Sequence, residues 1–373
     1  FTTLYHLIFI VKIKIIMKVC ILGSGLTSLT LAKTLANIGI NVDIFSNVIN
    51  QKYNKIRTIG ISKSNLEFFN KNILNLESIL WDINKIEIYS EILNNEKILK
   101  FENQNQKLFS TIKNHQLIDH LFSSLKKNKF INFKKKFNLN LSKKNNYKLI
   151  FNCEQNNLLS KKIFSKKINK SYNSYAYTAI IKHKKLLDND LASQTFTKEG
   201  PIAFLPISST ETSVVYSVKG KKKINLKEMI NKYNLKYEIN KVSEIFSFEL
   251  NSLQLRTYYH KNILAFGDLL HKLHPLAGQG FNMSIRDIKE ILKLINHRRD
   301  HGLDLDHSIC SDFEKNTKHK NYLFSNGIDF IHEFFNFENK IKNNLFSKSV
   351  KFLGKNKITN NIFKDIADRG IVI

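Results

Sequence analysis

The sequence predicts an α/β fold in which a parallel-stranded part, built from both ends of the chain, encloses a mainly antiparallel part and is followed by a helical tail. An apolar run, a glycine turn and a segment of helical periodicity follow one another at residues 18–39. Alternating apolar residues fill 171–218, and helical periodicity dominates 284–373. Because 373 residues exceed the usual size of one hydrophobic core, two interleaved domains are expected.

The individual elements follow in order. KVCIL at 18–22 is a strand of apolar residues, the segment from 26 to 38 is a helix that Gly39 ends, and INVDIFS begins a second strand. Helices are predicted at 65–75 and 115–125, with short strands in IEIYSEI and ILKFEN between them. YKLIFNC and KNILAFGD are predicted as further strands of the first sheet, and LKEMINKYN as a helix. Together these elements describe one sheet with strands from both ends of the chain.

This order gives the predicted domain boundaries. The parallel domain comprises residues 17–75, 109–168 and 258–320, the antiparallel domain comprises 76–108 and 169–257, and a helical region covers 321–373. Residues 1–16 are expected to be a non-native extension, because Met17 directly precedes the first strand. Their apolar run is interrupted by Lys12 and Lys14 and is too short to span a bilayer.

The composition gives a strongly basic chain. Lysine and arginine number 59 against 31 aspartates and glutamates, which gives a formal net charge of +28. Such a charge would attract nucleic acid or an anionic membrane. The excess lysine, however, is spread along the chain with Asn, Ile and Phe, whose codons are A/T-rich, so compositional drift explains it as well. Since no nucleic-acid-binding module is recognisable, no nucleic-acid partner is predicted.

The three cysteines, Cys20, Cys153 and Cys310, lie far apart and have no paired spacing. Neither a disulfide framework nor a metal site is therefore predicted. The chain is expected in a reducing cytoplasm, with peripheral attachment to the inner face of the membrane as the alternative.

The turn after the first strand has the place and spacing of a dinucleotide-binding fingerprint. It reads Gly23-Ser24-Gly25-Leu26-Thr27-Ser28. The first glycine permits the tight turn, the second lets main chain approach a pyrophosphate, and the helix N-terminus supplies free N–H groups. Ser28 replaces the third glycine, and Ser46 stands where an acceptor for ribose hydroxyls is expected. A βαβ unit without a ligand is the alternative interpretation of this motif alone.

A second glycine-rich stretch is GDLLHKLHPLAGQGFN at 267–282, which holds three of the 13 glycines and one of the 3 prolines. With ILAF before it and MSIRD after it, this stretch resembles the second flavin motif of the ubiquinone-biosynthesis hydroxylases, the UbiH/COQ6 family of FAD-dependent aromatic monooxygenases. The residues in the family's places are His274, Pro275, Gly278, Gln279, Gly280, Asn282 and Asp287. Ser284 replaces a glycine, and DIADRGI near the end of the chain also looks like the family's C-terminal end. A turn without a ligand is the alternative.

The resemblance implies a Rossmann-like FAD-binding domain of the class A flavin monooxygenase type, interleaved with a mainly antiparallel β substrate domain. Asp268 would accept a hydrogen bond from a ribityl hydroxyl, and the helix near Asn282 would aim its positive end at the flavin N1–C2=O edge. Arg57 would neutralise cofactor phosphate, with a surface salt bridge as the alternative. The implied cofactor-binding residues are Gly23, Gly25, Leu26, Thr27, Ser28, Ser46, Arg57, Gly267, Asp268, Pro275, Gly278, Gln279, Gly280, Phe281 and Asn282.

The candidate catalytic residues are Pro275, His274 and His271, on the loop that would face the flavin. Pro275 would stiffen this loop. Histidine has a pKa suited to proton transfer. Because the cofactor carries out the difficult chemical step, we favour the alternative that the histidines fix the loop by hydrogen bonding.

By the same resemblance, NAD(P)H or another donor reduces FAD, O2 adds at flavin C4a, and the hydroperoxide hydroxylates the aromatic ring of a polyprenylated phenol in ubiquinone biosynthesis. The implied partners are this hydrophobic substrate, O2, and a membrane or a quinone-biosynthesis complex. The family's middle motif is altered, because Glu154-Gln155 replaces Asp-Gly and Lys161 replaces an arginine. The alternatives are a catalytically impaired component of such a complex and a flavin hydroxylase of a soluble aromatic.

Overall fold

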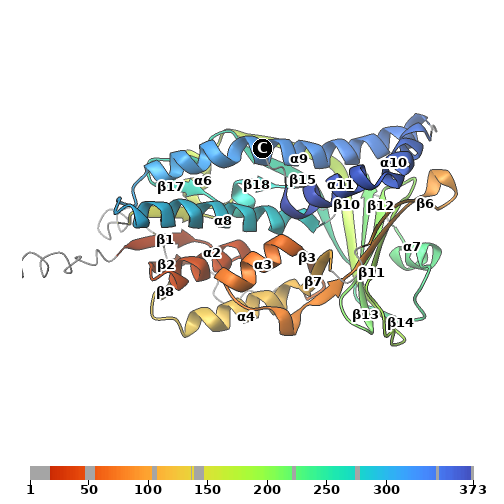
Figure 1. The fold of residues 1–373 in the computed structure, drawn as a ribbon, viewed down its shortest axis with the longest axis horizontal. Helices are drawn as coiled ribbons and strands as arrows, with labels where there is room; N and C mark the ends of the chain where they lie inside the picture. The colour runs from red at the N-terminus through yellow and green to blue at the C-terminus, as the bar shows by residue number, and fades with distance from the viewer. Residues whose placement is uncertain are drawn as a thin grey trace, which may run out of the picture.

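The protein has two parts that lie side by side, as the computed structural model shows (Figure 1). One part is a six-stranded sheet with helices, and the other is dominated by a nine-stranded sheet. The structure describes residues 17–46, 55–102, 107–135, 137, 147–220, 224–273, 278–341 and 344–370. Residues 1–16, predicted as a non-native extension, lie outside this range.

The six-stranded sheet draws its strands from both ends of the chain, as predicted. Its order is β16 (Tyr259–His260), β17 (Ile263–Ala265), β9 (Leu149–Asn152), β1 (Lys18–Leu22), β2 (Asn41–Phe45) and β8 (Ile131–Lys134). The strands from β17 to β8 are parallel, and β16 is the antiparallel partner of β17. The carboxyl ends of β1, β9 and β17 therefore meet at one edge of the sheet.

Helices pack against this sheet and its neighbours. They are α2 (Leu26–Asn37), α3 (Lys63–Asn72), α4 (Asn114–Lys126), α6 (Leu158–Ile163) and α8 (Gln279–Asp300). Helix α8 lies beside α2, α3 and α9 (Ser308–Ile341). α10 (Leu345–Lys355) and α11 (Lys357–Arg369) complete the helical C-terminal region that the sequence predicts (Figure 1). Among the described helices, none combines the length and apolar character that crossing a bilayer requires.

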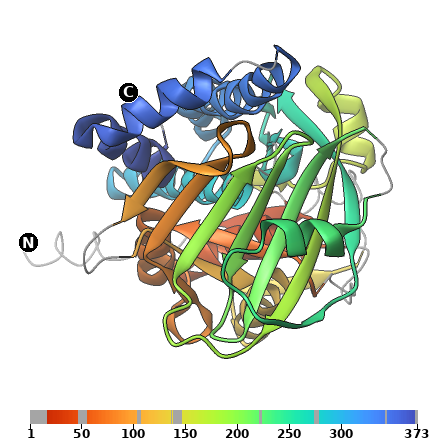
Figure 2. The same cartoon turned by 90° about the vertical axis from the view of Figure 1, so that its right-hand side faces the viewer.

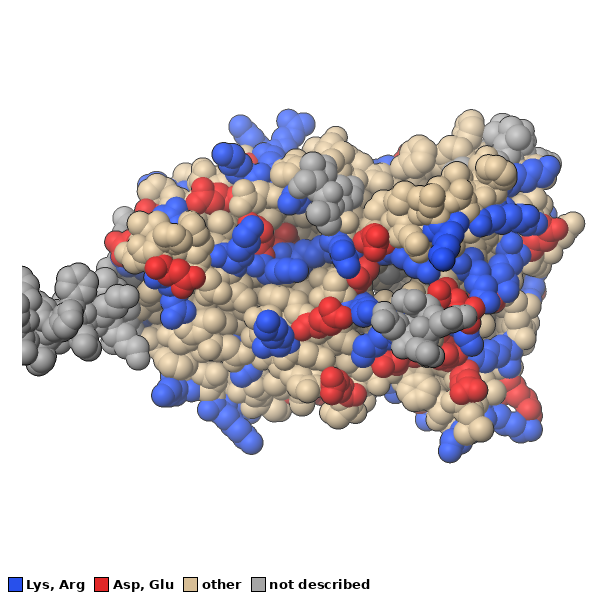
Figure 3. Space-filling view, in the orientation of Figure 1, with Lys and Arg blue, Asp and Glu red and all other residues tan. Residues whose placement is uncertain are grey.

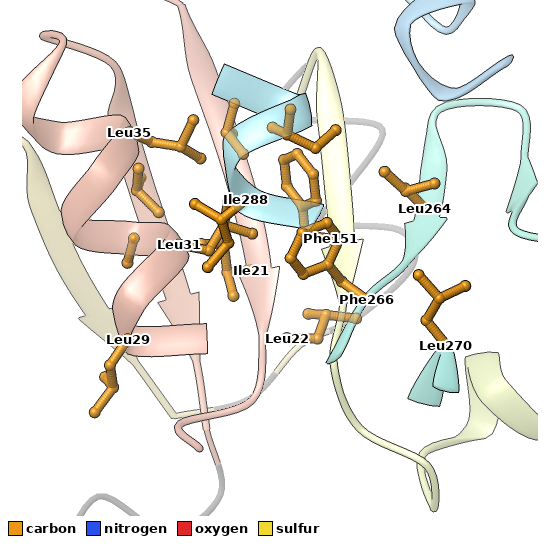
Figure 4. Close-up of a cluster of buried hydrophobic side chains, with 14 of the residues drawn as sticks. Ile21, Leu22, Leu29, Leu31, Leu35, Phe151, Leu264, Phe266, Leu270 and Ile288 are labelled. Carbon is orange, nitrogen blue, oxygen red and sulfur yellow. The ribbon is translucent and has the colours of Figure 1, made fainter. Parts of the chain in front are cut away.

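The apolar core fills the space between the sheet and these helices (Figure 4). Ile21, Leu31 and Ile288 are fully buried there. The rings of Phe151 and Phe266 meet edge to face with centroids 5.6 Å apart. Parallel strands are covered on both faces, which is why β1, β9 and β17 consist almost entirely of apolar residues.

The nine-stranded sheet forms the other part and is antiparallel except between β11 and β5. Its order is β18 (His271–Lys272), β15 (Phe246–Leu255), β10 (Lys167–His183), β13 (Glu211–Lys219), β12 (Pro201–Pro206), β11 (Leu191–Phe196), β5 (Lys85–Ser90) and β6 (Glu96–Glu102), with β14 (Ile239–Val242) paired to β10. Helix α7 (Leu226–Tyr233) crosses one face (Figure 2) and packs Leu226 and Ile230 against it. The predicted mainly antiparallel domain is confirmed.

A three-stranded sheet touches both parts. It consists of β3 (Thr58–Ser62), β7 (Phe109–Lys113) and β4 (Trp81–Ile83). Thr111 donates a hydrogen bond to the Pro206 carbonyl at 2.5 Å. Three short helices, η1 (Glu77–Ile79), η2 (Glu91–Leu93) and η3 (Gly267–Leu269), complete the described elements. Two strands do not follow the predicted domain division. Strand β4 lies in the range 76–108, predicted as antiparallel domain, but belongs to the three-stranded sheet, and β18 lies in the range 258–320, predicted as parallel domain, but belongs to the nine-stranded sheet. The residue boundaries between the domains therefore stay predictions.

The substitution Phe266→Ala is expected to lower the free energy of unfolding by about 3–5 kcal/mol. The ring is fully buried between Phe151 and Phe313, so its removal leaves a cavity. Urea denaturation measures the change. Leu158→Ala is the control, because that side chain is 83% exposed and should change stability by less than about 0.5 kcal/mol. Equal effects of the two substitutions would contradict this account of the core.

Candidate functional site

The candidate site lies where β1, β9 and β17 end. Ligands of open parallel sheets bind in the crevice outside the carboxyl ends of the strands. Gly23 follows β1, Cys153 follows β9, and Gly267 comes two residues after β17. The sheet order thus brings the fingerprint, the middle motif and the second flavin motif together.

The turn at Gly23 requires glycine. Its φ is +118°, and a Cβ there would lie 3.0 Å from Ser28 Oγ and 3.2 Å from Glu154 Cγ. At Gly25, no described atom comes within 4 Å of a Cβ position. Helix α2 begins there with neither a side-chain cap nor an acidic residue in its first turn. Open space therefore lies in front of an uncapped helix N-terminus, which favours an anionic ligand.

Ser46 lies beside this turn, at the carboxyl end of β2. Its hydroxyl is 2.7 Å from the hydroxyl of Ser24, and its main-chain N–H donates to the Lys134 carbonyl at 3.1 Å. A serine hydroxyl thus stands where the fingerprint calls for a carboxylate. Hydroxyl groups both donate and accept, so this position suits a ribose.

The two glycine motifs touch each other. Gly267 has φ +60°, and a Cβ at this position would lie 3.0–3.3 Å from the side-chain atoms of Thr27. Next to it, Asp268 exposes its side chain, and its carbonyl accepts a hydrogen bond from Gln155 Nε2 at 2.5 Å. Residues separated by more than two hundred positions in the sequence therefore form one continuous site.

Side-chain hydrogen bonds hold the altered middle motif, which has no glycine. Asn157 Nδ2 donates to Asn152 Oδ1 at 2.8 Å, and Asn152 Nδ2 donates to Ser160 Oγ at 2.9 Å. Asn157 also caps α6 by accepting from the Ser160 main-chain N–H. Glu154 is half-buried over the Gly23 turn, and burial raises the pKa of its carboxyl group. Lys161 is exposed.

The N-terminus of α8 is also uncapped. Gly278, its N-cap residue, has φ +63°, and α8 has neither a side-chain cap nor an acidic residue in its first turn. No described atom lies within 4 Å of a Cβ position at Gly280. Phe281 is buried and meets Phe69 edge to face. At Gly280 the positive end of this helix is therefore not covered by any described residue, and the resemblance implies the flavin ring at this place.

Asn282 uses its side chain within the protein. Its Oδ1 accepts from the Ser62 main-chain N–H at 2.9 Å and from Asn65 Nδ2 at 3.1 Å. Its Nδ2 donates to the Gly60 carbonyl at 3.0 Å. These three bonds fasten the first turn of α8 to β3 and α3, so the Asn282 side chain positions the helix that a ligand would meet.

His271, a candidate catalytic residue, is buried in an ion pair. Its Nε2 lies 2.5 Å from Asp287 Oδ2, and Asp287 Oδ1 accepts from Asn321 Nδ2 at 3.1 Å. Burial lowers the pKa of the imidazole, but Asp287 outweighs this effect and the net pKa is raised. The pair joins β18 to α8 and α9, and both roles predicted for His271 stay predictions. His274 and Pro275, the other two candidates, lie outside the described residues.

Arg57 is exposed, and its carbonyl accepts from the Asn114 main-chain N–H at 2.9 Å.

The contacts of the C-terminal helix with the site were not predicted. Arg286 donates to Gln279 Oε1 and to the carbonyls of Ala367 and Asp368, each at 3.3 Å, and burial lowers its pKa to about 10. The resemblance of DIADRGI to the family's C-terminal end drew attention to this segment, but it did not predict which residues the segment contacts.

Several known proteins resemble this chain. No protein-family model matches it. The 3-demethoxyubiquinol 3-hydroxylase of Escherichia coli is 26% identical over 154 residues, 38% of this chain and 39% of that protein. The mitochondrial ubiquinone biosynthesis monooxygenase COQ6 of Schizosaccharomyces pombe is 21% identical over 251 residues, 54% of this chain and 52% of that protein. The chain is thus similar, at low identity, to ubiquinone-biosynthesis hydroxylases. It spans about half or less of the length of these curated relatives.

Solved structures agree on the fold. The p-nitrophenol 4-monooxygenase PnpA of Pseudomonas putida has a TM-score of 0.74 at 10% identity, over 95% of this chain and 99% of that one. Klebsiella pneumoniae HpxO, solved with FAD and uric acid, has a TM-score of 0.70 at 11% identity, over 95% and 97%. The predicted fold, an FAD-binding type of α/β domain interleaved with an antiparallel domain, is confirmed.

The His271–Asp287 pair is expected to make stability depend on pH. Because the folded pKa of His271 is raised above its unfolded value of about 6.5, its contribution is complete below that pH and is lost as pH rises through the folded pKa. His271→Gln should remove this dependence and cost about 3–5 kcal/mol, since it leaves Asp287 buried without its cation.

Urea denaturation of the wild type and the variant at a series of pH values above about 6 measures this contribution. The control is His260→Gln, because His260 is exposed. If His271→Gln kept the pH dependence of the wild type, the ion pair would not be its source.

Asn282→Ala is expected to destabilise the protein by about 2–4 kcal/mol, because the buried N–H of Ser62 and the amide of Asn65 lose their acceptor. Thermal or urea unfolding measures the loss. Asn361→Ala, on the exposed side of α11, should be nearly neutral. A neutral Asn282→Ala would show that α8 is held without this residue.

Proposed function

We propose that the chain binds FAD and hydroxylates the aromatic ring of a polyprenylated phenol on the route to ubiquinone. The contact of Gly267 with Thr27 carries this proposal, because it joins the fingerprint and the second flavin motif in one site. Helices α2 and α8 begin within these two motifs, and neither has a side-chain cap at its N-terminus. The hydroxylases among the relatives support the same chemistry.

The residues of the site fit FAD. Gly23 and Gly25, with the start of α2, would hold the pyrophosphate, and Ser46 would meet a ribose. The exposed carboxylate of Asp268 would accept from a ribityl hydroxyl. Gly278 and Gly280 would allow main chain against the ring, over the buried Gln279 and Phe281. When bound, FAD supplies the electron transfer and the activation of O2.

The protein itself would position the reactants and exclude water. Asn282 and the His271–Asp287 pair keep α8 in place, so its positive end stays aimed at the ring position. NAD(P)H is the proposed electron donor, because residues 151–162 occupy the place of the family's middle motif. Glu154 keeps a carboxylate there and Lys161 an exposed cation. Attachment to a membrane or to a quinone-biosynthesis complex is part of the proposal.

A second candidate is a catalytically impaired flavin-binding component of such a complex. The observation that favours it is the position of Glu154, whose Cγ would lie 3.2 Å from a Cβ at Gly23. A carboxylate at this turn opposes a pyrophosphate whenever it is ionised. This candidate predicts FAD binding without any increase of O2 consumption when substrate is added.

Gly267→Ala is expected to weaken FAD binding at least about tenfold, because the methyl group would push against Thr27 and strain a left-handed backbone. Quenching of flavin fluorescence on titration measures the affinity. Gly302→Ala is the matched control, because φ there is +66° but no described atom lies within 4 Å. Equal affinities of the two variants would contradict the proposed flavin site.

Complementation of strains blocked at individual ubiquinone hydroxylations tests the activity. Rescue of one strain, with the quinone product identified by mass, would assign both the reaction and the ring position. A chain that binds FAD but rescues none of these strains, and whose O2 consumption phenolic substrates do not increase, would favour the impaired component.

A further inference from the structure

Helix α11 has an apolar stripe that faces solvent. Ile358, Ile362 and Ile366 recur every four residues and therefore share one side of the helix. Their side chains are 71%, 49% and 40% exposed. Figure 3 shows uncharged surface over α11, with lysine and arginine side chains beside it. An exposed apolar surface with a basic border marks an interaction site.

The preceding helix extends this surface. On α10, Phe352 is 77% exposed and Leu353 is 40% exposed. The exposed Lys348 and Lys355 lie four residues before and three residues after Phe352, so they share its side of the helix. Residues 345–370 contain six lysines and arginines against two aspartates. Apolar side chains and cations thus occur together on what we call the α10–α11 face.

The opposite side of α11 is fixed to the protein by polar contacts. Asn360 donates to the Lys100 carbonyl at 3.0 Å, and Lys364 donates to the Glu102 carbonyl at 3.1 Å. One turn further on, Asp368 Oδ1 accepts from the Ser64 main-chain N–H at 2.8 Å. These three residues also recur every four positions, about half a helical turn away from the isoleucines. The helix therefore docks by its polar side and presents its apolar side outward, the reverse of an ordinary surface helix.

We propose that the α10–α11 face, made of Phe352, Leu353, Ile358, Ile362 and Ile366 with Lys348 and Lys355, rests on an anionic lipid bilayer. An apolar face accompanied by lysines is the pattern of a helix that lies in the membrane interface. A second copy of the chain fits less well, because two molecules of net charge +28 repel each other while anionic lipid attracts both.

The position of this face connects it to the candidate site. Asp368 lies at the end of α11 against Ser64, and its carbonyl accepts from Arg286, which also contacts Gln279 of the second flavin motif. A lipid surface on α11 would thus lie near the start of α8, beside which the proposed function places a prenylated phenol. This part of the inference rests on the proposed function, but binding to lipid does not.

The experiment is co-sedimentation of the full-length, FAD-supplemented protein with vesicles of phosphatidylcholine and phosphatidylglycerol in equal parts. The triple substitution Ile358→Gln, Ile362→Gln and Ile366→Gln should lower the vesicle partition coefficient at least about tenfold, because apolar burial is lost while helix propensity is kept. Leu187→Gln with Leu235→Gln is the matched control, since these leucines are 87% and 70% exposed in loops beside β14. Circular dichroism checks that each variant is folded.

A second variant, Lys348→Gln with Lys355→Gln, tests the electrostatic contribution. It should bind these anionic vesicles more weakly, while its binding to pure phosphatidylcholine, which is weaker already in the wild type, should hardly change. Triple-variant binding equal to that of the wild type would overturn the proposal. So would a dimer, seen in sedimentation velocity without lipid, that the triple substitution abolishes. Hydroxylation of a short-chain, water-soluble phenol should not change in the triple variant, so the result separates this proposal from the proposed function.

Discussion

The close approach of two distant glycine motifs is the constraint on which the site depends. Gly267 can lie against Thr27 only because it has no side chain and can adopt φ +60°. This approach in turn requires β17 and β1 to share a sheet, with β9 between them.

Around this contact, buried polar interactions fix one helix at two points. Asn282 holds the start of α8 to β3, and Asp287, five residues later, holds it to His271 and Asn321. The bonds from the Ser62 N–H to Asn282 and between His271 and Asp287 are buried, so their loss leaves unpaired polar groups away from water. The positive end of α8 is therefore held in a fixed direction before any ligand arrives, as the proposed stabilisation of a reduced flavin would require.

Local patterns in the sequence were sufficient for the βαβ unit, both glycine motifs and the helical tail, because each depends on neighbouring residues. Long-range partners were not predictable in the same way. The resemblance places Asn282 among the cofactor-binding residues but does not predict the hydrogen bonds of its side chain, which join residues about two hundred and twenty positions away. The pairing of β18 with β15 and the hydrogen bond from Arg286 to a carbonyl of α11 are also long-range contacts. The apolar periodicity of the sequence does not predict them.

The network of Asn152, Asn157 and Ser160 has a consequence for how this site tolerates change. The resemblance implies a glycine in this loop, whereas this chain holds the loop with amide and hydroxyl groups. The conformation of this loop therefore depends on hydrogen bonds among three residues and not on the backbone freedom of one glycine. Substitution of Asn152 or of Asn157 would remove a hydrogen bond from each of the other two residues, so the loop depends on the three residues together.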